Sequence, residues 1–181
     1  IVVRKLHLTG VGGILHSNKD HYVHLILQHW KGALQNSNNN LTPFAWAVLM
    51  HTYSPAFLTK NSDRIKSRVR FITQENTEIG IQALLEQTHG ADGWTVLELA
   101  EKVIETHAIR SNTSLSIRLL RGELDQLCSV DDVMLLKSYL QRGMTETSCT
   151  VECVKECGHG VPMEAARAWR KDVLEFLVEG N

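Results

Sequence analysis

The sequence predicts an all-α fold, a compact domain of about eight helices preceded by a short N-terminal strand or extended arm. Two observations lead to this prediction. Apolar residues recur at helical spacing along most of the chain, and several segments carry helix start and stop signals. The composition of the 181 residues, 43% hydrophobic and 22% charged, is typical of globular domains. We expect residues 1–19 to form the arm and residues 20–181 the helical domain, with a subdivision considered near residues 90–94.

The N-terminal half contains the clearest start signals. Alternation of side chains over residues 2–8 predicts the strand or arm. A first helix begins near Asp20, with its apolar residues on one face. A second begins at Thr42 with Pro43 in its first turn, a favoured place for proline, and its apolar composition predicts a central buried helix.

The other helices are predicted from the same periodicity. Thr95 and Glu98 have the spacing of a capping box, so a helix is expected to start there. Ser129 and Asp132 mark another start. The remaining helices are expected from about residues 62 and 77, over about residues 113–127, 129–141 and 146–156, and from Pro162 onward.

A cluster of cysteine and histidine residues near the C-terminus is the sharpest local motif, comprising Cys149, Cys153, Cys157 and His159. Thiolates and imidazoles are the ligands of structural zinc. On one continuous helix the first and third cysteines would lie about 12 Å apart along the axis. A single ion would therefore require the helix to end before Cys157, with Cys128 as a distant partner. The competing and favoured interpretation is a buried stripe of free thiols.

A basic segment is the second candidate site, comprising Lys60, Arg64, Lys66, Arg68 and Arg70. On a helix these cations would flank an apolar stripe and could contact phosphates or an acidic partner. Arg118 and Arg121 would extend the patch if they lay nearby. The alternative is an ordinary solvated helix face, which is favoured because no aromatic residues are interleaved with the charges.

The sequence contains no complete enzymatic signature. It has neither a Gly-x-Ser-x-Gly nucleophile motif nor a phosphate-binding P-loop. The prediction is therefore a non-enzymatic helical module for protein–protein interaction or assembly, with a protein partner favoured and a nucleic-acid-contacting helix at residues 60–70 as the second variant. The alternative is a zinc-stabilised regulatory domain built on the Cys/His cluster. Apart from zinc in that alternative, no cofactor is expected.

Net charge and cysteine content limit which partners and which cellular compartment are expected. The formal net charge of −1 gives no global attraction for nucleic acid or for an anionic membrane. No apolar run approaches the roughly 20 residues of a membrane span. Four cysteines, three of them within nine residues, make a poor disulfide framework. We therefore expect an intracellular protein, cytoplasmic or nuclear, that binds a protein partner or itself. The first residue, Ile1, predicts a processed end or a fragment.

Overall fold

The computed structural model describes residues 4–10, 22–38, 40–77, 79–83, 104–105, 115–143 and 148–178. The helix start predicted at Thr95 and most of the helix predicted from residue 77 lie outside these ranges. No helix in the described ranges is both long enough and apolar enough to cross a bilayer.

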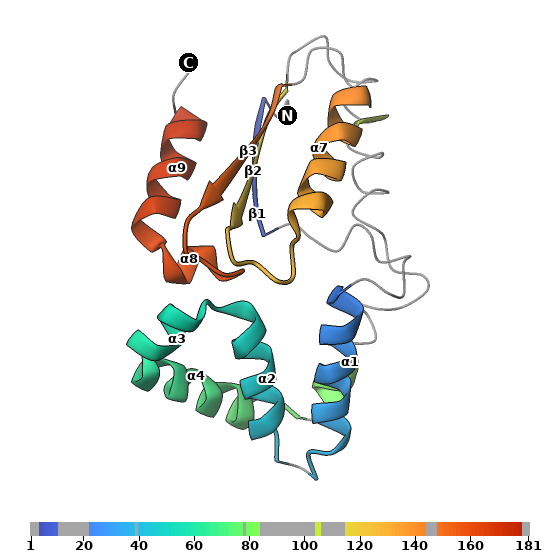
Figure 1. Cartoon of the computed structure of the whole chain (residues 1–181), viewed down its shortest axis with the longest axis vertical. Coiled ribbons are helices and arrows are strands. Elements are labelled where there is room, and N and C mark those ends of the chain that lie inside the picture. Colours follow the sequence, from blue (N-terminus) through green and yellow to red (C-terminus); the bar gives the residue numbers. More distant parts are fainter. Residues whose placement is uncertain are drawn as a thin grey trace.

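A three-stranded parallel sheet forms the centre of the upper layer in Figure 1. Its strands are β1 (Lys5–Thr9), β2 (Ser116–Gly122) and β3 (Ser148–Val154), in the order β1-β2-β3. Both pairings are parallel; Lys5 pairs with Ser116, and Ser116 pairs with Ser148. The all-α prediction is therefore wrong, because the fold is α/β.

Two segments account for this error, since the helices predicted over about residues 113–127 and 146–156 are replaced by β2 and β3. Strands of a parallel sheet are covered on both faces and read as continuous apolar runs without clear alternation. The sequence of β2 is SIRLLRG, and its last four residues are all buried. A short run of this kind is ambiguous between a buried helix and a buried strand.

Two helices cover opposite faces of the sheet. Helix α7 (Val130–Gly143) packs on one face and α9 (Ala166–Val178) on the other, after the short helix α8 (Val161–Glu164). The predicted start of α7 is confirmed: Asp132 donates its backbone N–H to Ser129 Oγ, and Ser129 donates its own to Asp132 Oδ2. The core between the sheet and α7 comprises Leu115, Ile117, Leu119, Cys128, Val133, Leu136, Leu140 and Cys149.

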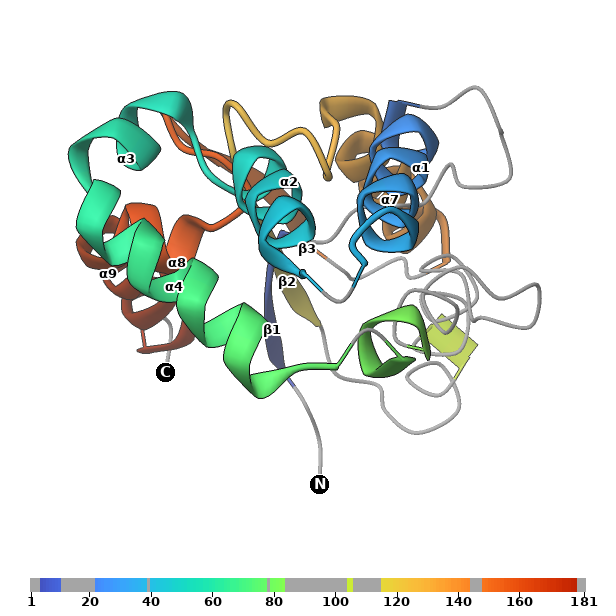
Figure 2. The ribbon, with the colours of Figure 1, turned by 90° about the horizontal axis from the view of Figure 1, so that it is seen from below.

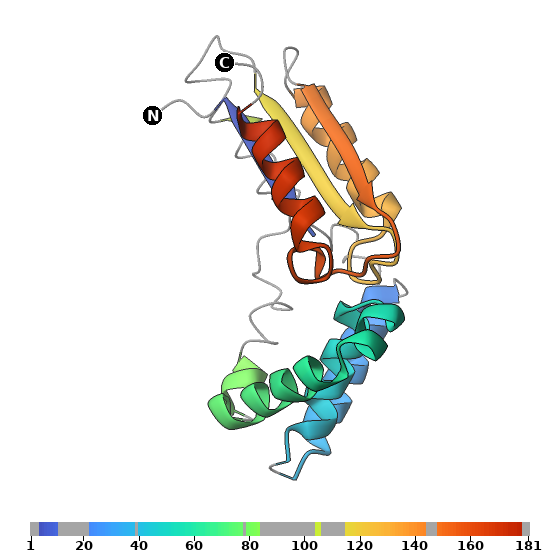
Figure 3. The ribbon, with the colours of Figure 1, turned by 90° about the vertical axis from the view of Figure 1, so that its left-hand side faces the viewer.

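Helices form a second layer at the carboxyl ends of the strands, which we call the helical layer. Among the described residues it includes α1 (Tyr22–Gln35), α2 (Thr42–Thr52), α3 (Pro55–Lys60) and α4 (Ser62–Glu75). Figures 2 and 3 show this layer lying across the lower end of the sheet. Its apolar residues pack in two clusters, one around Leu34, Leu41, Phe44 and Ile81 and one around Ala45, Leu49, Tyr53, Ile65 and Val69.

The junction between these layers is where a site is expected. In open parallel sheets, ligands bind outside the carboxyl ends of the strands, because the connecting loops present side chains there. The loops that follow β2 and β3 both lie at this junction, facing the helical layer (Figure 1).

Candidate functional site

A histidine and an aspartate meet at the carboxyl ends of β2 and β3. Asp125 lies three residues after the end of β2, and His159 lies five residues after the end of β3. The Nδ1 atom of His159 is 3.0 Å from Asp125 Oδ2 and 3.2 Å from Oδ1. The aspartate side chain is completely buried, whereas the histidine side chain is 31% exposed. This geometry is a buried acid that orients a partly accessible imidazole.

The loop after β2 holds the carboxylate rigidly. Asp125 Oδ1 accepts hydrogen bonds from the backbone N–H groups of Leu127 and Cys128, both at 2.8 Å. The buried guanidinium of Arg121 donates to the carbonyls of Cys128 (3.1 Å) and Asp125 (3.4 Å). An ionised carboxylate only accepts hydrogen bonds. Facing an ionised carboxylate, Nδ1 of His159 is the donor in this contact. In the neutral imidazole the lone pair then lies on Nε2.

The loops after β2 and β3 are joined by backbone hydrogen bonds. Leu124 donates its N–H to the carbonyl of Cys157 at 2.8 Å, and Glu123 donates to that of Val154 at 2.8 Å. Gly122 permits this close crossing, because a Cβ there would lie only 2.1 Å from the Gly158 carbonyl oxygen. The relative position of the acid and the histidine is thus fixed by main-chain packing.

The end of β1 also reaches the histidine. A Cβ on Gly10 would lie 3.0 Å from Cε1 of His159, so the imidazole packs directly over this glycine. Gly10 has a φ of 65°, in the left-handed region that favours glycine. Its N–H donates to the Leu120 carbonyl at 2.9 Å. All three strands of the sheet therefore end at the His159–Asp125 pair.

The arrangement suits proton transfer. Among the described residues, Nε2 of His159 has no hydrogen-bond partner, so it is available to take a proton from a group brought beside it. A histidine whose Nδ1–H is held by a buried carboxylate has the orientation needed for general-base catalysis.

The basic segment lies elsewhere in the fold, on α3 and α4 of the helical layer. Arg64 and Arg68 border a groove of about 310 Å³ whose other lining residues are Tyr53, Phe57, Ile65, Ser67, Phe71 and Met163. Lys66 forms an exposed ion pair with Asp63 at 3.5 Å. Lys60 and Arg70 are exposed.

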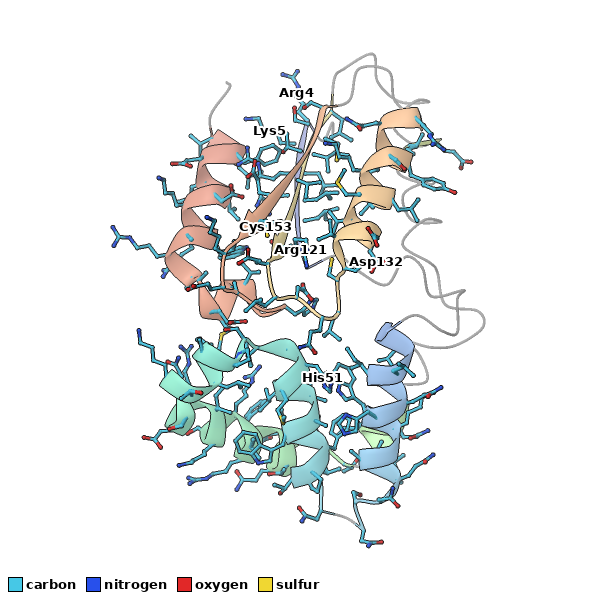
Figure 4. The ribbon with its side chains drawn as sticks, in the orientation of Figure 1. Arg4, Lys5, His51, Arg121, Asp132 and Cys153 are labelled. Carbon is cyan, nitrogen blue, oxygen red and sulfur yellow. The ribbon has the colours of Figure 1, made fainter. Side chains whose placement is uncertain are left out.

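Arg118 and Arg121 do not extend that segment, because both belong to β2. Arg118 binds Asp172 of α9 at 2.7 Å, and Asp172 also contacts His7 of β1 at 2.8 Å. Arg121 is buried at the carboxyl end of β2, at the same end of the sheet as Asp132 (Figure 4). These two arginines stabilise the packing of α9 and the Asp125 loop instead of forming a surface with α4.

The cysteine and histidine cluster does not converge on one point. Cys149 and Cys153 lie on β3, where a rise of about 3.3 Å per residue separates them by roughly 13 Å. Cys157 packs with Leu120 and Val161 in a buried cluster. His159 is engaged by the aspartate. Within the described ranges, no three His, Cys, Asp or Glu side chains are placed to hold a metal ion, and the zinc-stabilised interpretation is therefore wrong.

The four thiols differ in environment, and none of them forms a disulfide in the described structure. Burial raises the pKa of Cys128 and of Cys157 to about 12, and nearby carboxylates reinforce both shifts. Burial also raises the pKa of Cys149. Only Cys153 is exposed. Because the thiolate is the reactive form, we expect Ellman's reagent at pH 8 to modify one thiol per folded chain quickly. Cys153→Ser should abolish that fast phase, and fast reaction of two or more thiols would contradict the assignment.

Sequence reasoning missed the acid and misjudged the histidine. Asp125 was not considered, and His159 was assigned to a zinc site. One signal was available, because side chains that follow neighbouring parallel strands meet at the carboxyl edge of the sheet, where ligands bind. Reading residues 113–127 and 146–156 as helices concealed those strands.

Comparison with known proteins supports the fold. No protein-family model matches the sequence, and no curated protein is similar to it. Solved structures do match. The enzyme MGS-M2, an α/β-hydrolase from a Medee basin deep-sea metagenome library, is 16% identical with a TM-score of 0.66. The match covers 98% of this chain and 57% of that one.

Two further solved structures have the same architecture. The enol-lactonase from Burkholderia xenovorans LB400 is 13% identical with a TM-score of 0.61, covering 97% of this chain and 56% of the lactonase. The 2-hydroxy-6-oxo-6-phenylhexa-2,4-dienoate hydrolase from Rhodococcus sp. strain RHA1 is 16% identical with a TM-score of 0.58, covering 96% and 55%. The chain thus has the α/β-hydrolase fold over little more than half the length of these structures.

These matches correct the functional prediction. The structural neighbours are hydrolytic enzymes, so the interpretation of the chain as a non-enzymatic interaction or assembly module with a nucleic-acid-contacting helix is overturned. The mistake followed from the all-α prediction, which left no place where an acid and a base could converge.

Proposed function

We propose that this chain carries the acid and the base of a hydrolytic enzyme that acts on carbonyl esters or lactones. The observation that supports this most directly is the contact between His159 Nδ1 and the buried Asp125 carboxylate at 3.0 Å, at the carboxyl ends of a parallel sheet. The order of the two residues along the chain, acid before histidine, is that of the α/β-hydrolase triad.

In this mechanism each residue has a separate task. Asp125 holds the imidazole in the tautomer with its proton on Nδ1, and it stabilises the positive charge that develops on the ring. Nε2 of His159 accepts the proton of the attacking hydroxyl, thiol or water, and later donates it to the leaving group. Arg121 has no contact with the reacting atoms and acts by holding the loop that carries Asp125.

The nucleophile is a separate question. In this fold it precedes the acid along the chain, within a Gly-x-Ser-x-Gly elbow, and the 181 residues contain no such motif. We propose that the His159–Asp125 pair serves a nucleophile that is not among the described residues. The shorter length of this chain relative to the matched structures supports that proposal.

The cellular compartment and the binding partners of the protein are separate proposals that do not affect the mechanism. The lack of a disulfide among the four described cysteines supports an intracellular, reducing compartment. Self-association or a protein partner stays a proposal, and neither is needed for the acid–base chemistry.

Changing the acid to its amide tests the proposed function. In Asp125→Asn the amide can present its NH₂ group to the imidazole and favour the tautomer with its proton on Nε2, which cannot act as a base. We expect kcat for hydrolysis of p-nitrophenyl butyrate, measured on the full-length protein as it occurs in its source, to fall about 10³–10⁴-fold.

The matched control is Asp63→Asn, since Asp63 is 95% exposed on α4 and should leave kcat unchanged. A ¹⁵N NMR spectrum of the imidazole gives a second measurement that needs no turnover: the protonated nitrogen of neutral His159 should change from Nδ1 to Nε2. If the wild-type protein hydrolyses the ester and Asp125→Asn retains its full rate, the proposed function is excluded.

A further inference from the structure

Glu164 connects the loop that carries His159 to the helical layer. Its Oε1 atom accepts the backbone N–H of Gly158 at 2.9 Å. Its Oε2 atom accepts both donors of Ser54, the backbone N–H at 3.1 Å and the hydroxyl at 2.5 Å. Ser54 is 2% exposed and also begins α3, because its hydroxyl accepts the N–H of Phe57. One carboxylate thus accepts three hydrogen bonds from Ser54 and Gly158, which are 104 residues apart in the sequence.

The surrounding packing leaves no room for another arrangement. A Cβ on Gly158 would lie 2.8 Å from Glu164 Oε1 and 2.8 Å from the Ser54 nitrogen. Gly160 donates its N–H to the Thr52 carbonyl at 3.0 Å. His159 therefore lies between two glycines that both contact the junction of α2 and α3.

The chemistry of the site requires a carboxylate. All three partners are donors, and a carboxylate is the side chain that accepts at both oxygens. Glutamine cannot replace it, because its NH₂ group would face an N–H of Gly158 or of Ser54 in either orientation. Aspartate is one methylene shorter and cannot keep Oε1 and Oε2 at both partners.

We propose that Glu164 is a positioning residue that fixes the His159 loop, and hence Nε2, relative to the helical layer; this inference rests on the proposed function. Asp125 orients the imidazole of His159 from the side of the sheet. Glu164 holds the backbone of the His159 loop, at Gly158, from the side of the helical layer. Together they determine where Nε2 stands relative to any group bound between the two layers.

Glu164→Gln in the full-length protein tests the inference. We expect kcat for ester hydrolysis to fall about 10–100-fold, because misplacing a catalytic group by about 1 Å can cost about 10²-fold in rate. KM should change less than threefold. Amide hydrogen exchange at Gly158 and Ser54 should accelerate at least tenfold. Imidazole ¹⁵N shifts of His159 should move, which a general loss of stability without a local change would not produce.

Two further variants make the test specific. Ser54→Ala removes the hydroxyl donor and keeps the other two hydrogen bonds, so it should lower kcat less than Glu164→Gln does, and it carries the test if Glu164→Gln does not fold. The double variant should be no slower than Glu164→Gln, since the Ser54 hydroxyl reaches the His159 loop only through the Glu164 carboxylate. Glu175→Gln is the matched control, because Glu175 makes only an exposed pair with Lys171 at 3.5 Å.

The possible outcomes separate this inference from the proposed function. Suppose that Asp125→Asn abolishes hydrolysis, while Glu164→Gln keeps the wild-type kcat and the wild-type ¹⁵N chemical shifts of His159. The positioning role of Glu164 is then wrong, and the proposed function stands. If Asp125→Asn leaves hydrolysis intact, the proposed function fails, and a catalytic role for Glu164 fails with it. Faster exchange at Gly158 and Ser54 in Glu164→Gln would then show a structural contact only.

Discussion

His159→Ala is expected to slow ester hydrolysis about 10⁴–10⁶-fold in the full-length protein, the largest effect of any single change in this chain. The imidazole is the titratable side chain that contacts the buried Asp125 carboxylate and is itself 31% exposed. Its loss removes the general base of the proposed mechanism. The measurement is kcat/KM with p-nitrophenyl butyrate across pH 5–9.

The control for this change is His29→Ala. His29 is exposed on α1 and contacts the ring of His51, and its loss should leave kcat/KM within twofold of wild type. Added imidazole should restore part of the His159→Ala activity, because the alanine leaves space beside Gly10 for a free base. Activity of His159→Ala within tenfold of wild type would exclude the histidine as the base.

Gly122→Ala should lower the free energy of unfolding by about 3 kcal/mol, an effect at the upper end of that expected from overpacking. The new Cβ would lie 2.1 Å from the Gly158 carbonyl oxygen and 2.3 Å from that of Cys157. Both are backbone atoms, so the loop after β3 must move away from the end of β2. That movement separates His159 from Asp125, and kcat should fall together with stability.

Urea unfolding followed by tryptophan fluorescence measures the change in stability. Gly32→Ala is the matched control: a Cβ there would meet nothing within 4 Å in α1. Alanine is the better helix former, so Gly32→Ala should raise stability by about 0.5–1 kcal/mol. Unchanged stability and activity in Gly122→Ala would mean that the crossing of the two loops is looser than the structure shows.

Local signals were sufficient for most of the helices. The helix starts predicted near Thr42, residue 62 and Ser129 agree with α2, α4 and α7. Each of these helices has its amphipathic stripe or its start signal within its own sequence, and helical hydrogen bonds join residues only four apart. A short window of sequence therefore contains the information that determines such an element.

The sheet could not be obtained in that way. Ser116 pairs with Ser148, 32 residues later, and with Lys5, 111 residues earlier. Little local pattern distinguishes SIRLLRG in β2 from a helical segment, because burial alternates only at its start and its last four residues are all buried. Reading β2 and β3 as helices produced the wrong fold class, and with it the wrong placement of Cys149 and Cys153 on one face of a helix.

The sequence by itself determined where α2, α4 and α7 begin, because helical periodicity and start signals are local properties. Only the tertiary structure decided that Asp125 and His159, 34 residues apart, form one acid–base pair. Their meeting depends on two parallel strands that end side by side, and on Gly122 allowing the two following loops to cross in contact. Those are long-range backbone contacts that no residue pattern in either segment specifies.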